Sequence, residues 1–372
     1  MTQPATLRSP VFRTATGRVY NFSAGPAVLP ETVLLEVKEE LPVYRQLGTS
    51  ILEISHRSSE YTAIAESAKS LLRKLLGLDE SWHVLFLQGG ASLQFYQVPL
   101  NFLPSGGSAD YLITGHWAKR AFQDAQLVGR VRVAASSEDR QFCYIPDPSS
   151  WALDAQAAYL HFTSNNTIYG TQFPFDPEVE VPLICDASSD FLSRRIDPKR
   201  YSLIYAGAQK NVGPAGVTIV LVHEALLQRR NQPLPPVLDY GVHATKLFNT
   251  PPVFAVYIVE KVLRWLEGLG GLPAIEAINN RKAELLYRRI DQSDFYRGTA
   301  ELASRSKMNV TFRLPSEALE KRFVEEAQQA GLIGLKGHRL VGGLRASIYN
   351  ACPIEAVEAL ISFMDYFEQR YG

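Results

Sequence analysis

The chain has 372 residues, of which 46% are hydrophobic and 20% charged, a composition typical of a globular protein with a sizeable core. Lysine plus arginine and aspartate plus glutamate both number 38, so net charge gives no reason to expect nucleic acid or an anionic membrane as a partner. Three scattered cysteines and the lack of a long apolar run argue against a disulfide framework, a metal site and a membrane span, and favour a cytoplasmic location.

The chain begins with a stretch that lacks the apolar core of a secretory signal. We expect residues 1–17 to form a flexible extension, although the absence of acidic residues there leaves a transit peptide open. Farther along, Ser58 and Ser59 predict the start of a helix that ends near Leu76, where Gly77 follows.

Short apolar segments then alternate with helical patterns, which predicts an α/β fold with a mainly parallel sheet. A strong helix over 254–266 ends in a glycine-rich stretch, after which a long charged helix runs to about residue 290. We therefore expect a large domain over 18–268, with an N-terminal arm over 18–30, and a smaller α/β domain over 269–372. The expected strands lie at 83–87, 111–114, 159–163, 181–185, 202–205, 217–222, 308–314 and 340–349, and further helices at 316–330 and from 353.

Unusual polar residues or glycines follow several of these strands. They are Gly89–Gly90, Trp117, Thr167, Asp186 and Lys210. Because ligands of open α/β sheets bind at the carboxyl ends of the strands, this shared position predicts one site.

These residues match the needs of pyridoxal 5′-phosphate (PLP), which binds a lysine covalently and needs a carboxylate at its ring nitrogen. Lys210, among small residues, fits the first need and Asp186 the second. Trp117 could stack on the ring, and the turn before Ser92 could hold the phosphate at a helix N-terminus. Taken singly, each has an ordinary alternative: a surface lysine, a loop carboxylate, a core indole or a simple turn.

Two pairs of basic residues lie in loops of this electrically neutral chain. His56–Arg57 precedes a helix, and His338–Arg339 lies in a glycine-rich segment that leads to Arg345. Since the planar guanidinium group binds carboxylate and phosphate through two hydrogen bonds, the pairs indicate an anionic substrate. The alternative is solvated surface charge.

From about residue 20 to residue 372 the chain resembles the phosphoserine aminotransferase family, class V of the fold-type-I PLP enzymes. The resemblance implies a seven-stranded sheet, a homodimer with shared active sites, and serine biosynthesis as the role. The implied reaction moves the amino group of L-glutamate to 3-phosphohydroxypyruvate, which gives O-phospho-L-serine and 2-oxoglutarate. The resemblance to the family is carried by sequence blocks at 21–27, 48–50, 55–57, 206–216, 248–252, 307–310 and 331–351, in that order.

The resemblance also assigns roles to single residues. Lys210 matches the Schiff-base lysine, Asp186 the partner of the ring nitrogen, and Arg345 the group that binds the substrate α-carboxylate. Some members carry an arginine at the position of Ser92, so recognition of the distal anion would rest more on the basic pairs. The implied cofactor contacts are Ala91, Ser92, Trp117, Thr167, Gln209, Asn249 and Thr250, the last two from the neighbouring subunit. The implied substrate contacts are Ser23, Ala24, His56, Arg57, His338, Arg339 and Arg345, with His56 and Arg57 from the partner.

Three other interpretations stay open at this stage. An alanine–glyoxylate or serine–pyruvate aminotransferase would not need the two basic pairs. A cysteine desulfurase is disfavoured, because Cys185 falls in an expected buried strand and Cys143 and Cys352 have no activating neighbour in the sequence. A non-catalytic PLP-binding protein would not need Arg345. Activity on 4-phosphohydroxy-L-threonine, which would link the chain to pyridoxine biosynthesis, is also undecided.

Overall fold

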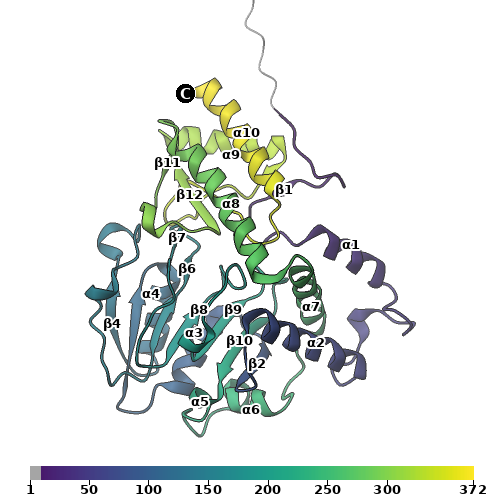
Figure 1. Cartoon of the computed structure of the whole chain (residues 1–372), viewed down its shortest axis with the longest axis vertical. Helices are drawn as coiled ribbons and strands as arrows, with labels where there is room; N and C mark the ends of the chain where they lie inside the picture. The colour runs from purple at the N-terminus through teal and green to yellow at the C-terminus, as the bar shows by residue number, and fades with distance from the viewer. Residues whose placement is uncertain (1–9) are drawn as a thin grey trace, which may run out of the picture.

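The computed structural model describes residues 10–372 and is built around a seven-stranded sheet (Figure 1). The strand order is β2-β10-β9-β8-β5-β3-β4. The strands from β9 to β4 are mutually parallel, and β10 is antiparallel to both of its neighbours, so the mainly parallel sheet is confirmed. The strands are β2 (Trp82–Leu87), β3 (Ser108–Ile113), β4 (Arg130–Ser136), β5 (Leu160–Thr163), β8 (Leu183–Asp186), β9 (Leu203–Gly207) and β10 (Thr218–His223).

Helices cover both faces of this sheet, because the inner strands are apolar on both sides. In β8, Leu183 and Cys185 pack into the core beneath α2 and α7, while Ile184 packs into the core beneath α3 and α4. Within the described residues, none of the helices combines the length and the apolar character needed to cross a membrane. The helices of this part are α1 (Glu31–Glu40), α2 (Ser59–Leu76), α3 (Gly90–Phe102), α4 (His116–Gln126), α5 (Glu224–Leu227), α6 (Tyr240–Thr245) and α7 (Val253–Gly268).

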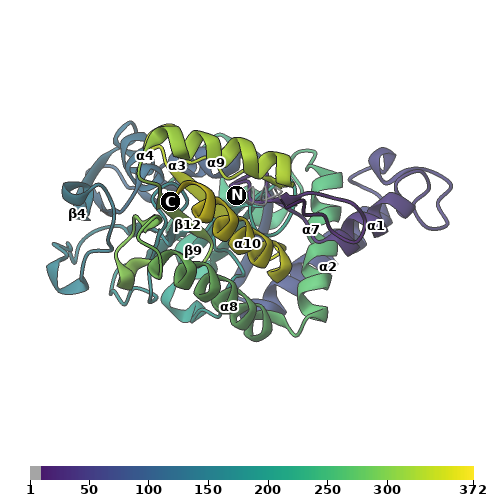
Figure 2. The same cartoon turned by 90° about the horizontal axis from the view of Figure 1, so that it is seen from above.

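A second unit with its own core lies over one end of the sheet, as Figures 1 and 2 show. It contains α8 (Gly271–Asp291), α9 (Glu317–Ala330) and α10 (Ile354–Tyr371). These helices pack against a sheet of β11 (Arg297–Gly298), β12 (Asn309–Arg313) and β14 (Leu344–Ser347). The division into domains at residues 268 and 269 stays a proposal.

The N-terminal arm joins this second unit rather than the large sheet. Strand β1 (Tyr20–Asn21) pairs in parallel with β13 (Leu332–Ile333), and the Phe12 backbone N–H donates to the carbonyl of Ala330. Residues 1–9 of the expected extension lie outside the described residues, so its flexibility stays a prediction. A small two-stranded sheet, β6 (Asn165–Asn166) with β7 (Thr171–Gln172), lies near the junction of the two units.

Local sequence signals explain most element boundaries. The Ser58 side chain accepts a hydrogen bond from the Tyr61 backbone at the start of α2, and Gly77 ends this helix in the left-handed conformation, with φ of 67°. The strand expected over 340–349 is shorter than predicted, because Gly342 and Gly343 take φ of 67° and 68° and turn the chain before β14 begins.

Candidate functional site

The polar residues that follow the sheet strands gather at its carboxyl end. Asp186 is the last residue of β8, and Lys210 follows β9. Thr167 lies between β6 and β7, and Trp117 is the second residue of α4. Within this group, Lys210 contacts Thr167, and Asp186 lies close enough to Lys210 to feel its charge.

Lys210 is held by a hydrogen bond and has an unusual acidity. Its Nζ donates to Thr167 Oγ1 over 2.8 Å. Burial lowers the pKa of Lys210 to about 8, with the charge of Arg345 adding to this effect and the carboxylate of Asp186 opposing it. An amine with this pKa is partly unprotonated near neutral pH and can serve as a nucleophile and a base.

Asp186 is a buried carboxylate that lacks an ion pair within 4 Å anywhere in residues 10–372. Its Oδ1 accepts a hydrogen bond of 2.9 Å from the Ser188 backbone, and burial raises its pKa despite the charge of Lys210. Burying an anion in this way is costly unless a cation meets it. A protonated pyridine nitrogen is such a cation, so Asp186 fits the PLP ring.

The turn before α3 suits a phosphate group. Gly89 and Gly90 have φ of 90° and 66°, and a Cβ at Gly89 would lie 2.6 Å from that of Leu93. The first turn of α3 carries no acidic residue and its N-cap offers no side-chain hydrogen bond, so the N–H groups that follow, including those of Ala91 and Ser92, are free to bind an anion. The residues present fit the phosphate of PLP.

Trp117 is placed by a close contact beneath the start of α4. Gly115 lies against Asn166, where a Cβ would approach Asn166 Oδ1 to 2.3 Å. Only glycine allows this approach, which brings the first turn of α4 down to the carboxyl end of β3. The indole of Trp117 is partly buried there, and its edge meets the ring of His116 at a centroid distance of 5.0 Å.

Arg345 brings a positive charge from β14 to the same place. Its Nη1 donates to the Thr167 carbonyl over 3.2 Å, while its Nε has no hydrogen-bond partner within residues 10–372. Burial lowers the pKa of Arg345, and none of the carboxylates in the described part of the chain pairs with it. A half-buried guanidinium without a counter-ion favours an anionic ligand.

The loop that leads to β14 adds a guanidinium and an imidazole. Arg339 is exposed and His338 half-buried, and the ring of His338 lies 6.4 Å from that of His116, centroid to centroid. The sequence prediction included His338 and Arg339 but missed His116. Its position between Gly115 and Trp117, directly after a strand, was the available signal.

The N-terminal arm closes the site from another side. A Cβ at Gly25 would lie 3.5 Å from Cγ of Lys210, and the Ala27 N–H donates to the Gln209 carbonyl over 2.8 Å. The Ala24 carbonyl accepts a hydrogen bond of 2.8 Å from the Tyr349 hydroxyl. The neighbouring Ser23 lies against Gly334, where a Cβ would come within 2.5 Å of the Ser23 backbone nitrogen.

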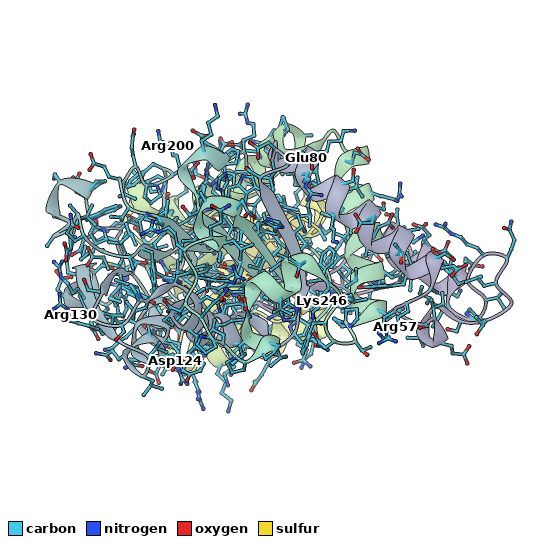
Figure 3. The ribbon with its side chains drawn as sticks, turned by 90° about the horizontal axis from the view of Figure 1, so that it is seen from below. Arg57, Glu80, Asp124, Arg130, Arg200 and Lys246 are labelled. Atoms are coloured by element: carbon cyan, nitrogen blue, oxygen red, sulfur yellow. The ribbon has the colours of Figure 1, made fainter. Side chains whose placement is uncertain are left out.

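The remaining predicted residues form a separate group. His56 and Asn249 line one surface cleft together with Lys246, and Figure 3 shows the exposed Arg57 on the side of the molecule that carries Lys246. Asn249 Nδ2 donates to Gln88 Oε1 over 2.7 Å, next to the Gly89 turn. The exposed residue Thr250 accepts a hydrogen bond from Gln88 through its carbonyl.

Comparison with known proteins gives a consistent result. A family model for class-V aminotransferases matches residues 19–360. The phosphoserine aminotransferase of Laribacter hongkongensis is 52% identical over 357 residues, covering 95% of this chain and 99% of that protein. The solved phosphoserine aminotransferase of Bacillus circulans subsp. alkalophilus is 50% identical, with a TM-score of 0.93 over 95% of this chain and 99% of that one. A PLP-bound phosphoserine aminotransferase of Trichomonas vaginalis is 38% identical, with a TM-score of 0.90 over 94% and 100% of the two chains. The family resemblance seen in the sequence is confirmed.

The unpaired carboxylate generates a prediction about stability. We expect Asp186→Asn to raise the melting temperature of the cofactor-free protein by about 2 °C or more, because a neutral isostere removes the cost of burying a charge. Added PLP should then stabilise the variant much less than the parent protein. Thermal denaturation with and without PLP measures both effects.

Asp176→Asn is the matched control. The Asp176 side chain is also largely shielded from solvent, but its Oδ1 pairs with Nη2 of Arg194 at 2.6 Å. Removing that carboxylate leaves a guanidinium unpaired and should lower the melting temperature. A lower melting temperature for both cofactor-free variants would contradict the assignment of Asp186 as a carboxylate that waits for a cation.

Proposed function

The chain belongs to the class-V aminotransferases and, within them, to the phosphoserine aminotransferases, which makes it a PLP-dependent transaminase; from this premise we propose that it moves an amino group between L-glutamate and 3-phosphohydroxypyruvate. The products are 2-oxoglutarate and O-phospho-L-serine. The choice of substrate rests on one observation. A series of cationic or basic side chains leads outward from Lys210 through Arg345 and His338 to Arg339, and within residues 10–372 none of them forms a salt bridge with a carboxylate. Both substrate pairs carry an α-carboxylate and a distal anion that match this series.

Residues on each side of the site would hold the cofactor. Asp186 would face the ring nitrogen, Trp117 a ring face, Thr167 and Lys210 the reactive edge, and the turn before Ser92 the phosphate. When bound, PLP supplies a ring that accepts electrons and so stabilises negative charge at the substrate Cα.

Lys210 is the proton carrier of the proposed reaction. Its Nζ takes the proton from Cα of the amino donor, and in the second half-reaction the same amine returns a proton to Cα of the acceptor. A pKa of about 8 lets this amine hold and release a proton near neutral pH. Thr167 Oγ1 orients Nζ through the hydrogen bond of 2.8 Å. Asp186 would hold the ring nitrogen and keep it protonated, because a buried carboxylate favours a positive neighbour.

Arg345 orients the substrate. Its guanidinium donates to the carbonyl of Thr167, and the hydroxyl of the same residue accepts the hydrogen bond from Lys210. Thr167 therefore fixes both the group that binds the α-carboxylate and the amine that acts at Cα. We assign His338 and Arg339 to the distal phosphate or γ-carboxylate. The arrangement gives the alanine–glyoxylate alternative less support, because acceptors without a distal anion would leave these groups without a ligand.

A homodimer is part of the proposal. Helix α1 and the segment after it project from one side of the molecule in Figure 2, and Leu52 in that segment is 60% exposed. Leu247 and Phe248, beside Asn249, are 53% and 42% exposed. Burial of such side chains favours association with a second copy, which would bring His56 and Arg57 to the partner's distal anion and Asn249 and Thr250 to its phosphate. We also propose a cytoplasmic location and leave 4-phosphohydroxy-L-threonine as a further candidate substrate.

A panel of amino acceptors tests the substrate assignment. Purified protein with PLP and glutamate should use 3-phosphohydroxypyruvate with a kcat/KM about 100-fold or more above that for pyruvate or glyoxylate. The reason is that the distal phosphate of this acceptor binds several hydrogen-bond donors that pyruvate and glyoxylate cannot reach. A coupled assay of 2-oxoglutarate formation measures the three rates. A preference for pyruvate or glyoxylate would keep the PLP chemistry and overturn the substrate.

Mixed dimers test the shared site. Arg57→Ala and Lys210→Ala should each have little activity alone. After subunit exchange, hybrid dimers should contain one intact site, so a one-to-one mixture should recover about a quarter of the wild-type sites by random pairing. Activity equal to the sum of the separate variants would show that Arg57 serves its own subunit, or that no dimer forms.

A further inference from the structure

The first turn of α4 adds an imidazole to the cationic groups of the site. His116 is the first residue of this helix, so the N–H groups of the turn and the positive end of the helix dipole lie around it. Its ring meets the edge of Trp117 at 5.0 Å and lies 6.4 Å from the ring of His338, with an angle of 35° between the two planes. His116 therefore links the cofactor side of the site to the loop of the second unit.

The charged groups around His116 are positive or already paired. On α4, both oxygens of Asp124 accept hydrogen bonds from Arg120, and after β4 Glu138 pairs with Lys119. The first turn of α4 carries no acidic residue. The loop of the second unit contributes His338 and Arg339, and Arg345 of β14 acts in turn on His338. Hence none of the described carboxylates is free to neutralise His116.

The two histidines differ in their capacity to accept a proton. Nδ1 of His338 accepts a hydrogen bond of 3.3 Å from the Leu340 N–H, which fixes the neutral ring with its proton on Nε2. In the described part of the chain, neither ring nitrogen of His116 has a hydrogen-bond partner. Burial, followed by the charges of Arg120, Arg339 and Lys119, lowers the pKa of His116. Before an anion arrives, both rings are mostly neutral near pH 7.

Resting on the proposed function, we infer that His116 binds the phosphoryl group of the substrate and takes up a proton from solvent when this group arrives. His338 donates to the same group as a neutral ring, through Nε2–H. A phosphoryl dianion attracts a proton to His116 more strongly than the single charge of a γ-carboxylate does. His116 therefore favours the phosphorylated substrate pair over glutamate and 2-oxoglutarate, and most strongly at lower pH.

The sign of the pH dependence follows from linkage. A bound dianion raises the pKa of His116 above its lowered value in the free site, so between these two values each binding event takes up a proton. Affinity for the phosphorylated ligand then falls as pH rises through this window, by at most about tenfold per pH unit for one proton. Below a pH of about 6 the phosphoryl group itself becomes protonated, so the test belongs above that value.

Two probes without an amino group measure binding in the holoenzyme without turnover. 3-Phosphoglycerate carries a carboxylate and a distal phosphate, and glutarate carries two carboxylates. Calorimetry near pH 7 in two buffers with different heats of ionisation counts the protons taken up, and titrations from about pH 6.5 to 8 give the slope of the dissociation constant. We expect clear proton uptake with 3-phosphoglycerate and much less with glutarate.

Substitutions at His116 separate its charge from its shape. His116→Asn should lose most of the proton uptake and raise the dissociation constant of 3-phosphoglycerate about fivefold near pH 6.5, the effect of one charge-assisted hydrogen bond, with little change for glutarate. His116→Lys should bind 3-phosphoglycerate tightly with a flat pH profile. Arg130→Gln is the control, because it removes a permanent charge from an exposed position that does not act on His116, and it should keep both the uptake and the slope.

The outcomes separate this inference from the proposed function. If wild-type holoenzyme fails to aminate 3-phosphohydroxypyruvate, the proposed function itself is wrong. If it does so while His116→Asn keeps the wild-type proton uptake and slope, only the role of His116 is overturned. Should His116→Asn fold poorly, as judged by circular dichroism, His116→Lys decides: a slope as steep as that of the wild type overturns the inference.

Discussion

The site depends on an imbalance of buried charge. Arg345 carries a positive charge into a half-buried position without a carboxylate, and Lys210 is so confined that its pKa falls to about 8. Asp186, the carboxylate at the end of β8, feels the charge of Lys210 but has no ion pair within 4 Å in residues 10–372, so a cation can still pair with it. Groups with such unpaired charges are stabilised by ligands of opposite charge. The ring nitrogen and phosphate of PLP and the two anionic groups of the proposed substrates would supply those charges.

The geometry of the site depends on contacts between the two units of the fold. Thr167 accepts a hydrogen bond from Lys210 at its hydroxyl and one from Arg345 at its carbonyl, so the proposed cofactor and substrate sides share one residue. Below them, the buried ammonium of Lys282 donates to the carbonyls of Ile348, Tyr349 and Cys352 and fixes the segment after β14. From that segment the Asn350 N–H donates to the Asn211 side chain, which fixes the residue next to Lys210. Such a chain of hydrogen bonds fixes the position of Lys210 relative to β14, which carries Arg345.

The sequence predicted what depends on local patterns. Ser58 and Gly77 marked the ends of α2, and the apolar segments before Asp186 and Lys210 gave the strands that bring these residues together. Strand β4 was not predicted, because at the edge of the sheet most of its residues are exposed or half-buried and only Ala134 is buried, so it lacks a continuous apolar segment. His116 was also missed, since its meaning arises from a loop more than 200 residues away. The position of His116 directly after a strand was a local signal, but its packing against that distant loop leaves no mark in a local pattern.

A crystal structure of the protein with PLP and 3-phosphoglycerate bound would test most directly whether unpaired charge selects the ligand. We predict a dimer with the cofactor ring between Trp117 and the sheet, its nitrogen at Asp186, and the α-carboxylate of the ligand on Arg345. The distal phosphate should contact His116, His338 and Arg339 of one subunit and Arg57 of the other. A phosphate held elsewhere, with Arg345 free of the carboxylate, would contradict the claim that unpaired buried charge selects this ligand.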